Sequence, residues 1–589
     1  MFGPFKRANR KSAHFDWRAR MPLIASVAAG LVMGAITGAW SIHAIGKWAF
    51  SGIAMDAGLG AYICSLLILL QKRLGRGIAL STICAFALYL AAIAKYEVMN
   101  TEASVVDLLL LDDLFINLSA NGGWVPYVVL GVMIALALAY LRNIRLPAKH
   151  ELVLFIPCAL YLAAIVLAMY PPQAMAAQMQ RATTGYTWFP LAVVRGHWGS
   201  FLRSGLSFAA RHQELVRLES VASPYMGFIG SDLGKANQRN IHIIVLESFI
   251  DPLSIPGAQI TPDPFAPMFQ EWRRSSGLRS VQPVFGGRSP DGEFEILCGL
   301  PVTLDDGAVI FSQLKLPSVD CLPRKLQSLG WKTESWVPVS PAEFSYDQAY
   351  ERIGIENRRF NGNMDMSDLD GVTLSAGSLL QQNLDHVRTM LKAQEHYLNY
   401  IFVTAGHFPY EVDRKKRPYQ VSVDPDSKLL MGYINCSYYT SHAVEGYITS
   451  LREIDPDAII VVLGDHPPGL PGLPSQITYP RPVATRFDVP LLIFNGREGA
   501  IDLKGRVPGY YIPGIIADLL TDGEFCRRNR CLHREPVAVR PLAHALLAID
   551  RASDRVVDCA AESQTDVCRR AELFSEGAKL GLYRLVGME

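Results

Sequence analysis

Three acidic or imidazole side chains directly follow short apolar runs, where they could bind a divalent cation. Glu247 follows the run 241–246, and Asp465 and His466 follow the run 458–463. Carboxylate oxygens and imidazole nitrogens are ligands that divalent metals accept, and a carboxylate can also act as a general base. Taken singly, Glu247 could instead be a helix-capping acid, and the Asp465–His466 pair is only a weak indication. The pattern therefore predicts a metal site provided that the three side chains meet.

A hydroxyl that could act as a nucleophile lies between them, in the segment 285–294 (FGGRSPDGEF). Its two glycines are followed by a helix start, with Ser289 as the N-cap, Pro290 as the first helical residue, and Asp291 and Glu293 in the first turn. One interpretation is that Ser289 only caps the helix. In the other, the helix dipole stabilises its alkoxide, backbone N–H groups hold a phosphate, and a nearby dication lowers the pKa of the hydroxyl.

A histidine in the segment 403–410 (VTAGHFPY) is the next candidate. His407 could donate to a substrate oxygen or act as the acid at a leaving group. A single histidine is more often structural, but its place after a predicted strand favours a functional role, because ligands of open α/β sheets bind at the carboxyl ends of strands.

The elements that must position these residues begin after residue 240, where short β-branched runs alternate with helical patterns. Such alternation predicts an α/β domain over 240–500, with a mostly parallel central sheet and helices on both faces. Strands buried on both faces read as continuous apolar runs. The expected strands are 241–246, 458–463 and 489–494, and the expected helices include 375–392 and 437–451.

The first third of the chain predicts a transmembrane domain over 1–170. Five apolar stretches each approach the ~20 residues that cross a bilayer. They are 22–46, 50–70, 77–95, 125–141 and 151–170. Basic residues flank the first span and follow the second and fourth, whereas the link after the third is acidic. The positive-inside rule then predicts a cytoplasmic N-terminus and, after five crossings, an outer α/β domain. The glycine-rich second stretch could be re-entrant, and the spans could serve only as an anchor.

Composition limits the remaining choices. The 56 Lys and Arg residues balance 55 Asp and Glu residues, which argues against a general nucleic-acid binder. We expect a linker with juxtamembrane helices over 171–239. The portion 501–589 could complete the α/β domain or form a small cysteine-containing appendage. Cysteines beyond residue 290 permit disulfides in an oxidising compartment, but their spacing does not reveal the pairing.

The order Glu247, Ser289, His407, Asp465–His466 resembles the alkaline-phosphatase/sulfatase superfamily. It is most similar to its membrane branch, the lipoteichoic-acid-synthase-type and periplasmic glucan phosphoglycerol transferases. The resemblance implies that Glu247, Ser289, Asp465 and His466 bind one divalent metal, with manganese favoured over magnesium or zinc. It also implies that His407 contacts the headgroup of the substrate.

Some positions depart from the pattern of this family. Ser289 replaces the usual threonine nucleophile, and the stretch after Trp336 lacks the family's Trp-Asn-Arg group. Asp291 and Glu293 stand where sulfatases have proline and arginine, which argues against maturation to formylglycine. We expect Arg288 and Trp336 to bind substrate together with His407.

The resemblance implies a membrane-bound transferase. Ser289 would attack the phosphodiester of a phospholipid headgroup, release diacylglycerol, and pass the phosphoryl group to a hydroxyl of a cell-envelope glycan. Phosphatidylglycerol is the preferred donor and phosphatidylethanolamine the second. The alternatives are a hydrolase at the same site, either a phosphodiesterase/phosphatase or a sulfatase type, and a membrane scaffold without catalysis.

Overall fold

The computed structural model describes most of 17–99 and 231–574, and only short runs between 131 and 228. Within the larger range, the main segments outside the description are 303–318, 478–486 and 535–546. The chain forms two compact units. The helical unit comprises Met1–Tyr96, Tyr127–Ala176 and Trp188–Arg203, and the sheet domain comprises Glu97–Pro126, Ala177–Thr187 and Ser204–Glu589.

Three long helices make up the described part of the helical unit: α1 (Trp17–Ile45), α2 (Phe50–Leu69) and α3 (Leu74–Met99). Met21–Ile42 and Phe50–Leu69 are long and apolar enough to cross a membrane, while the apolar part of α3 is shorter. These helices fit a membrane protein. The predicted fourth and fifth spans lie almost entirely outside the described residues, so five crossings stay a prediction.

Helices α1 and α2 approach each other closely through glycine. A Cβ atom at Gly30 would lie 2.2 Å from the carbonyl oxygen of Ala57, and one at Gly60 would lie 2.5 Å from Sδ of Met33. Small residues at such positions let two helix backbones come together, which is the usual way that helices associate in a bilayer.

A carboxylate is fully buried in the helical unit. Oδ2 of Asp56, on α2, accepts hydrogen bonds from the Thr37 hydroxyl at 2.5 Å and from the backbone N–H of His197 at 3.0 Å. Oδ1 accepts the backbone N–H of Trp198 at 2.8 Å. Asp56 thus caps the short helix 197–202, because the first N–H groups of a helix have no partner within it.

Replacing Asp56 with alanine should destabilise the helical unit by about 3 kcal/mol, because several buried donors lose their acceptor. Thermal unfolding of the detergent-solubilised full chain would measure the change. Ser81→Ala is the matched control, since the buried Ser81 hydroxyl has no hydrogen-bond partner among the described residues. Equal melting temperatures for the two variants would contradict the capping role.

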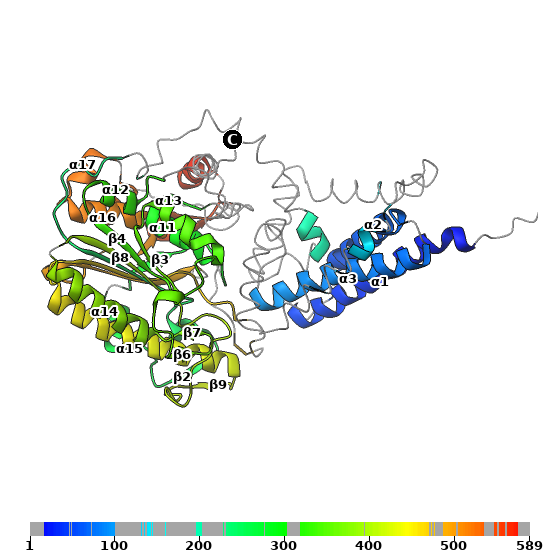
Figure 1. Ribbon diagram of the computed structural model, residues 1–589, viewed down its shortest axis with the longest axis horizontal. Helices are drawn as coiled ribbons and strands as arrows, with labels where there is room; N and C mark the ends of the chain where they lie inside the picture. Colours follow the sequence, from blue (N-terminus) through cyan, green and yellow to red (C-terminus); the bar gives the residue numbers. More distant parts are fainter. Residues whose placement is uncertain are drawn as a thin grey trace, which may run out of the picture. The chain divides into compact units, whose positions relative to one another are not determined.

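An eight-stranded sheet forms the centre of the sheet domain, in the order β12-β3-β11-β10-β1-β8-β4-β5 (Figure 1). The strands are β1 (Ile241–Leu246), β3 (Arg279–Val281), β4 (Lys332–Trp336), β5 (Asn357–Arg359), β8 (Tyr397–Val403), β10 (Ile459–Gly464), β11 (Asp488–Asn495) and β12 (Arg506–Pro508). Neighbouring strands from β5 to β10 are parallel, whereas β11 runs antiparallel to both β10 and β3. The predicted mostly parallel sheet is confirmed.

Helices cover both faces of this sheet (Figure 1). One face carries α11 (Ser289–Cys298), α12 (Leu322–Ser328), α13 (Tyr346–Ile353) and α16 (Ile512–Leu520), and the other carries α10 (Pro267–Arg274), α14 (Ala376–Lys392) and α15 (Lys428–Ile454). Side chains of β1 alternate between the two cores: Ile243 and Val245 enter the first, and Ile244 and Leu246 enter the second. This two-sided burial explains why β1 is apolar at every position except His242.

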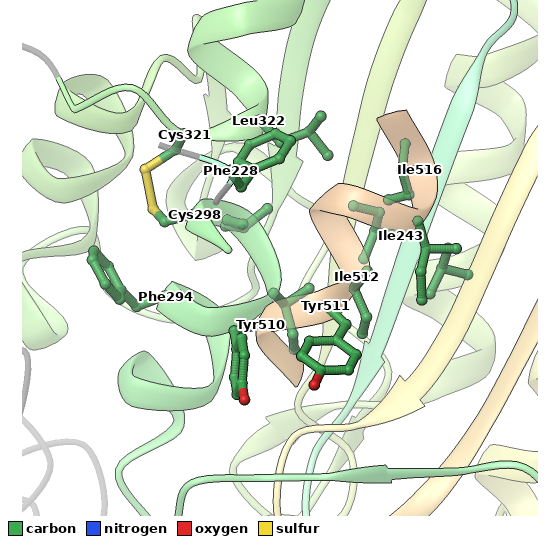
Figure 2. Close-up of a cluster of buried hydrophobic side chains, with 14 of the residues drawn as sticks. Phe228, Ile243, Phe294, Cys298, Cys321, Leu322, Tyr510, Tyr511, Ile512 and Ile516 are labelled. Carbon is green, nitrogen blue, oxygen red and sulfur yellow. A yellow bond between two sulfur atoms is a disulfide. The ribbon is translucent and has the colours of Figure 1, made fainter. Parts of the chain in front are cut away.

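Helix α11 packs into the hydrophobic core on the face of the sheet that also carries α12, α13 and α16. Phe294 of α11 packs in the same cluster as Ile512 of α16 and Ile243 of β1 (Figure 2). At the far end of α11, a buried disulfide joins Cys298 to Cys321, directly before α12. The N-terminal end of α11, which begins at Ser289, is therefore carried by a helix that is fixed along its length.

The C-terminal portion contributes to the sheet domain as well as to smaller elements. Strand β12 forms one edge of the central sheet. Two further disulfides, Cys526–Cys531 and Cys559–Cys568, lie in this portion.

Smaller described elements of the sheet domain lie outside the central sheet. They are the two-stranded sheets of β2 (Gln259–Thr261) with β9 (Ser422–Asp424), β6 (Leu369–Asp370) with β7 (Thr373–Leu374), and β13 (Leu547–Asp550) with β14 (Arg555–Asp558), and the helix α17 (Glu524–Arg528).

Candidate active site

The carboxyl ends of three neighbouring strands bring the predicted residues together. Glu247 follows β1, Asp465 and His466 follow β10, and the loop 404–407 follows β8. Backbone pairing continues one residue past the strands, since the Glu247 N–H donates to the Val403 carbonyl at 3.0 Å and the Asp465 N–H donates to the Leu246 carbonyl at 3.0 Å. Parallel neighbours end at the same edge of a sheet, which is why residues far apart in sequence meet here.

Four side chains form one compact, buried cluster. Oγ of Ser289 lies 3.4 Å from Oε2 of Glu247 and 3.4 Å from Nε2 of His466. Nε2 of His466 lies 3.5 Å from Oε1 of Glu247 and 3.2 Å from Oδ2 of Asp465. One ligand atom each from Glu247, Asp465 and His466 fits within 4.8 Å, a spacing that a single metal ion could bridge.

The chemistry of these donors fits a divalent cation. Nδ1 of His466 lies 3.0 Å from the Pro467 carbonyl, which assigns its proton to Nδ1 and leaves the lone pair of Nε2 facing the cluster. Oδ2 of Asp465 is buried and has no hydrogen-bond partner among the described residues. Burial and the neighbouring Glu247 carboxylate raise the pKa of Asp465, and burial lowers the pKa of His466. A dication would accept electron pairs from the carboxylates of Glu247 and Asp465 and from Nε2 of His466, which otherwise face one another.

Ser289 is not used as a helix cap. Helix α11 begins at Ser289 itself, and the cap position is taken by Arg288 in a left-handed conformation with φ of 67°. No side chain forms a cap hydrogen bond at this helix end. The predicted N-cap position is thus one residue too late, and the Ser289 hydroxyl points toward Glu247 and His466 instead.

Two residues that sequence reasoning missed support Glu247. The Ser248 hydroxyl donates to Oε1 of Glu247 at 2.7 Å, and the Ser248 backbone N–H donates to Oδ1 of Asp465 at 2.7 Å. Ser248 adopts φ of 52°, a left-handed conformation that makes both bonds possible. Gly406 lies against Glu247, where an added Cβ would be 2.7 Å from the Glu247 carbonyl oxygen. The sequence signal that could have identified Ser248 is its place directly after Glu247, an acid at the end of a strand.

Replacing Ser248 with alanine should weaken manganese binding about tenfold, because hydrogen bonds from outside a metal site orient its ligands. Isothermal titration of the full chain with manganese would measure the affinity. Ser254→Ala is the control, since the exposed Ser254 hydroxyl bonds only to a nearby backbone carbonyl. Equal affinities for the two variants would show that Ser248 does not orient Glu247.

His407 and Arg288, two further predicted site residues, are not ligands in the buried cluster. His407 is exposed, and its Nδ1 lies 2.7 Å from the Phe408 carbonyl. Arg288 adjoins Ser289, and its guanidinium pairs with Asp291 at 2.6 Å. Both stay candidates for substrate binding.

Trp336 does not join the cluster. It is buried in the core beneath α14, its indole N–H donates to Glu334, and Arg359 lies over its ring at 4.7 Å. In the sheet register Trp336 pairs with Ile401, two residues before the end of β8. Its predicted contact with substrate therefore stays a prediction that this placement does not favour.

The sheet domain shares its fold with solved structures. The sheet domain has the fold of the alkaline-phosphatase/sulfatase superfamily, and the resemblance predicted from sequence is confirmed. The crystal structure of the lipoteichoic acid synthase LtaP from Listeria monocytogenes is similar with a TM-score of 0.50 and 14% identity, over 63% of this chain and 98% of that one. This likeness shows the fold.

Two further proteins are similar to parts of this chain. A Streptococcus pyogenes phosphoglycerol transferase, GacH, aligns with 65% of this chain and 94% of its own, at 13% identity and a TM-score of 0.41. A cyclic β-1,2-glucan modification protein of Rhizobium meliloti (strain 1021) is 23% identical over 276 residues, 44% of this chain. The match spans only 42% of that curated relative. No protein-family profile matches the sequence.

Proposed function

We propose that this protein is a membrane-bound, metal-dependent phosphotransferase that moves a phosphoglycerol or phosphoethanolamine group from a phospholipid to a glycan. The observation that carries the proposal is the Ser289 hydroxyl, which is released from helix capping and lies 3.4 Å from both Glu247 and His466. A hydroxyl at a helix N-terminus, beside an acidic and imidazole cluster, is suited to attack phosphorus.

One divalent metal, with manganese favoured and magnesium or zinc as alternatives, would be held by Glu247, Ser289, Asp465 and His466. When bound it would supply positive charge that lowers the pKa of the serine hydroxyl and neutralises the phosphoryl oxygens. The buried Oδ2 of Asp465, which lacks a hydrogen-bond partner among the described residues, supports this assignment.

The chain's own residues would carry two in-line displacements. Oγ of Ser289 loses its proton and forms a bond to phosphorus, the bond from phosphorus to the diacylglycerol oxygen breaks, and that oxygen takes up a proton. An acceptor hydroxyl then loses its proton and attacks the same phosphorus, and Oγ of Ser289 leaves with its proton restored. The exposed His407, whose Nδ1–H faces the Phe408 carbonyl, would present Nε2 to the substrate, and in its doubly protonated form this nitrogen would donate the proton to the leaving oxygen. Arg288 would bind the phosphate.

The donor would come from the membrane and the acceptor from the cell envelope. Phosphatidylglycerol is the preferred donor and phosphatidylethanolamine the second, as the family resemblance implies. The name of the Rhizobium meliloti relative supports a glycan acceptor. Three disulfides in the sheet domain favour an oxidising compartment for this domain. Together with the five predicted spans and the family resemblance, this favours a bacterial cytoplasmic membrane with the sheet domain outside.

Incubation of the purified full chain with manganese and headgroup-labelled lipid tests this proposal. Diacylglycerol release together with label on an added cyclic glucan is the expected result, and the preferred lipid identifies the transferred group. Release with label only in water-soluble headgroup would instead show a hydrolase. No release from either lipid, with manganese bound, would reject a lipid donor.

A further inference from the structure

A second acidic residue of α11 lies one turn after the nucleophile. Glu293 follows Ser289 by four residues, so the two side chains share one face of the helix. The Glu293 side chain is completely buried. Neither the proposed metal site nor the proposed displacements use it.

Three tyrosine hydroxyls converge on this carboxylate. Tyr346 donates to Oε1 at 2.7 Å, and Tyr400 donates to Oε2 at 2.7 Å. Tyr350 also donates to Oε2. No lysine or arginine among the described residues forms an ion pair with Glu293, so neutral phenols alone hold its charge.

These hydrogen bonds connect α11, which carries Ser289, to two other elements of the sheet domain. Tyr346 and Tyr350 belong to α13, whereas Tyr400 belongs to β8, the strand that leads into the loop of His407. Glu293 therefore ties the helix of the nucleophile to the strand that ends beside Glu247. Three bonds to two separate elements fix both the position and the rotation of α11.

The burial of this charge has no evident benefit for stability. An ionised carboxylate without a cation is costly to bury, and an apolar residue of similar size is often less costly. Burial raises the pKa of Glu293, the phenol donors oppose that shift, and the charge of Glu247 adds to it. Because Glu293 lies about one turn of α11 from Ser289, a negative charge at Glu293 favours a cation at the site.

We propose that Glu293 is a positioning residue, which holds Ser289 against the metal ligands, and that its buried charge strengthens cation binding. The positioning part rests on the proposed function, whereas the electrostatic part requires only that the site binds a divalent metal.

The electrostatic part is tested by manganese titration of the full-length Glu293→Gln variant. We expect about tenfold weaker binding, because a buried charge acts on the site through a medium of low dielectric. Tyr346→Phe, which removes one hydrogen bond but keeps the charge, should bind manganese as the unmodified chain does. Unchanged affinity in a folded Glu293→Gln variant would overturn this part, even if the protein released no diacylglycerol.

The positioning part is tested by Tyr400→Phe, which keeps both the charge and the aromatic core. We expect kcat for diacylglycerol release to fall about tenfold with KM for lipid unchanged, because small displacements of a nucleophile are costly. Manganese affinity should not change. Glu271→Gln, an exposed acid on α10, is the control. An unchanged kcat for Tyr400→Phe would overturn the positioning role, and this test remains usable if Glu293→Gln does not fold.

Discussion

Replacing Ser289 with alanine should reduce diacylglycerol release by a factor on the order of 10⁴ or more, as loss of a nucleophile does in covalent catalysis. Among the described residues, Ser289 has the only hydroxyl that contacts both Glu247 and His466, whereas the nearby Ser248 hydroxyl donates to Glu247. Labelled lipid, incubated with the full chain and then resolved from protein, gives both the release rate and the label trapped on Ser289.

Ser289→Thr is the matched variant, since the resembling synthases use threonine and the hydroxyl is retained. It should keep a measurable part of the activity and form the same covalent adduct. Melting temperatures and manganese affinities of both variants would show that the fold persists. Wild-type release by a folded Ser289→Ala variant would exclude the covalent route.

Removal of divalent metal should abolish activity. Replacing Asp465 with asparagine should lower the thermal stability of the protein when manganese is present and raise it when metal is absent. With manganese present, Asp465→Asn loses a charged ligand, so the stabilisation by bound metal, about 2.7 kcal/mol at a hundredfold excess over Kd, should be lost. Without metal, the variant should melt at a higher temperature than the unmodified chain, because Glu247 no longer faces a second buried carboxylate.

Melting curves with chelator and with manganese would reveal this inversion. Asp488→Asn is the control, because Asp488 is a buried acid that pairs with Arg506 at 3.0 Å, away from the cluster. That variant should be less stable under both conditions. A lower melting temperature for Asp465→Asn in chelator would contradict the metal-site interpretation.

Much of the fold could be predicted because the central strands are buried on both faces. The runs 241–246 and 458–463 match β1 and β10 to within one residue, and the helix 375–392 matches α14. The helix expected at 437–451 is only the second half of α15, since its first turns are less regularly apolar. The antiparallel direction of β11 was not predictable, because burial patterns do not encode strand direction.

The candidate site was partly predictable for a related reason. Glu247, Asp465 and His466 are found directly after buried strands, so their meeting follows from sheet geometry. Ser248 and Glu293 were not identified as supporting residues, because their roles depend on partners distant in sequence. Trp336 was chosen by resemblance alone, and its contacts with Glu334 and Arg359 depend on the packing of α14.

The capping of 197–202 by Asp56 has a consequence for where the helical unit ends along the sequence. The N–H groups that Asp56 accepts belong to residues 141 and 142 positions later in the chain. A fragment that stopped at residue 170, after the last predicted span, would leave Asp56 as a buried carboxylate without these donors, which is costly. The smallest fragment of the helical unit that can be expected to fold therefore includes the helix 197–202.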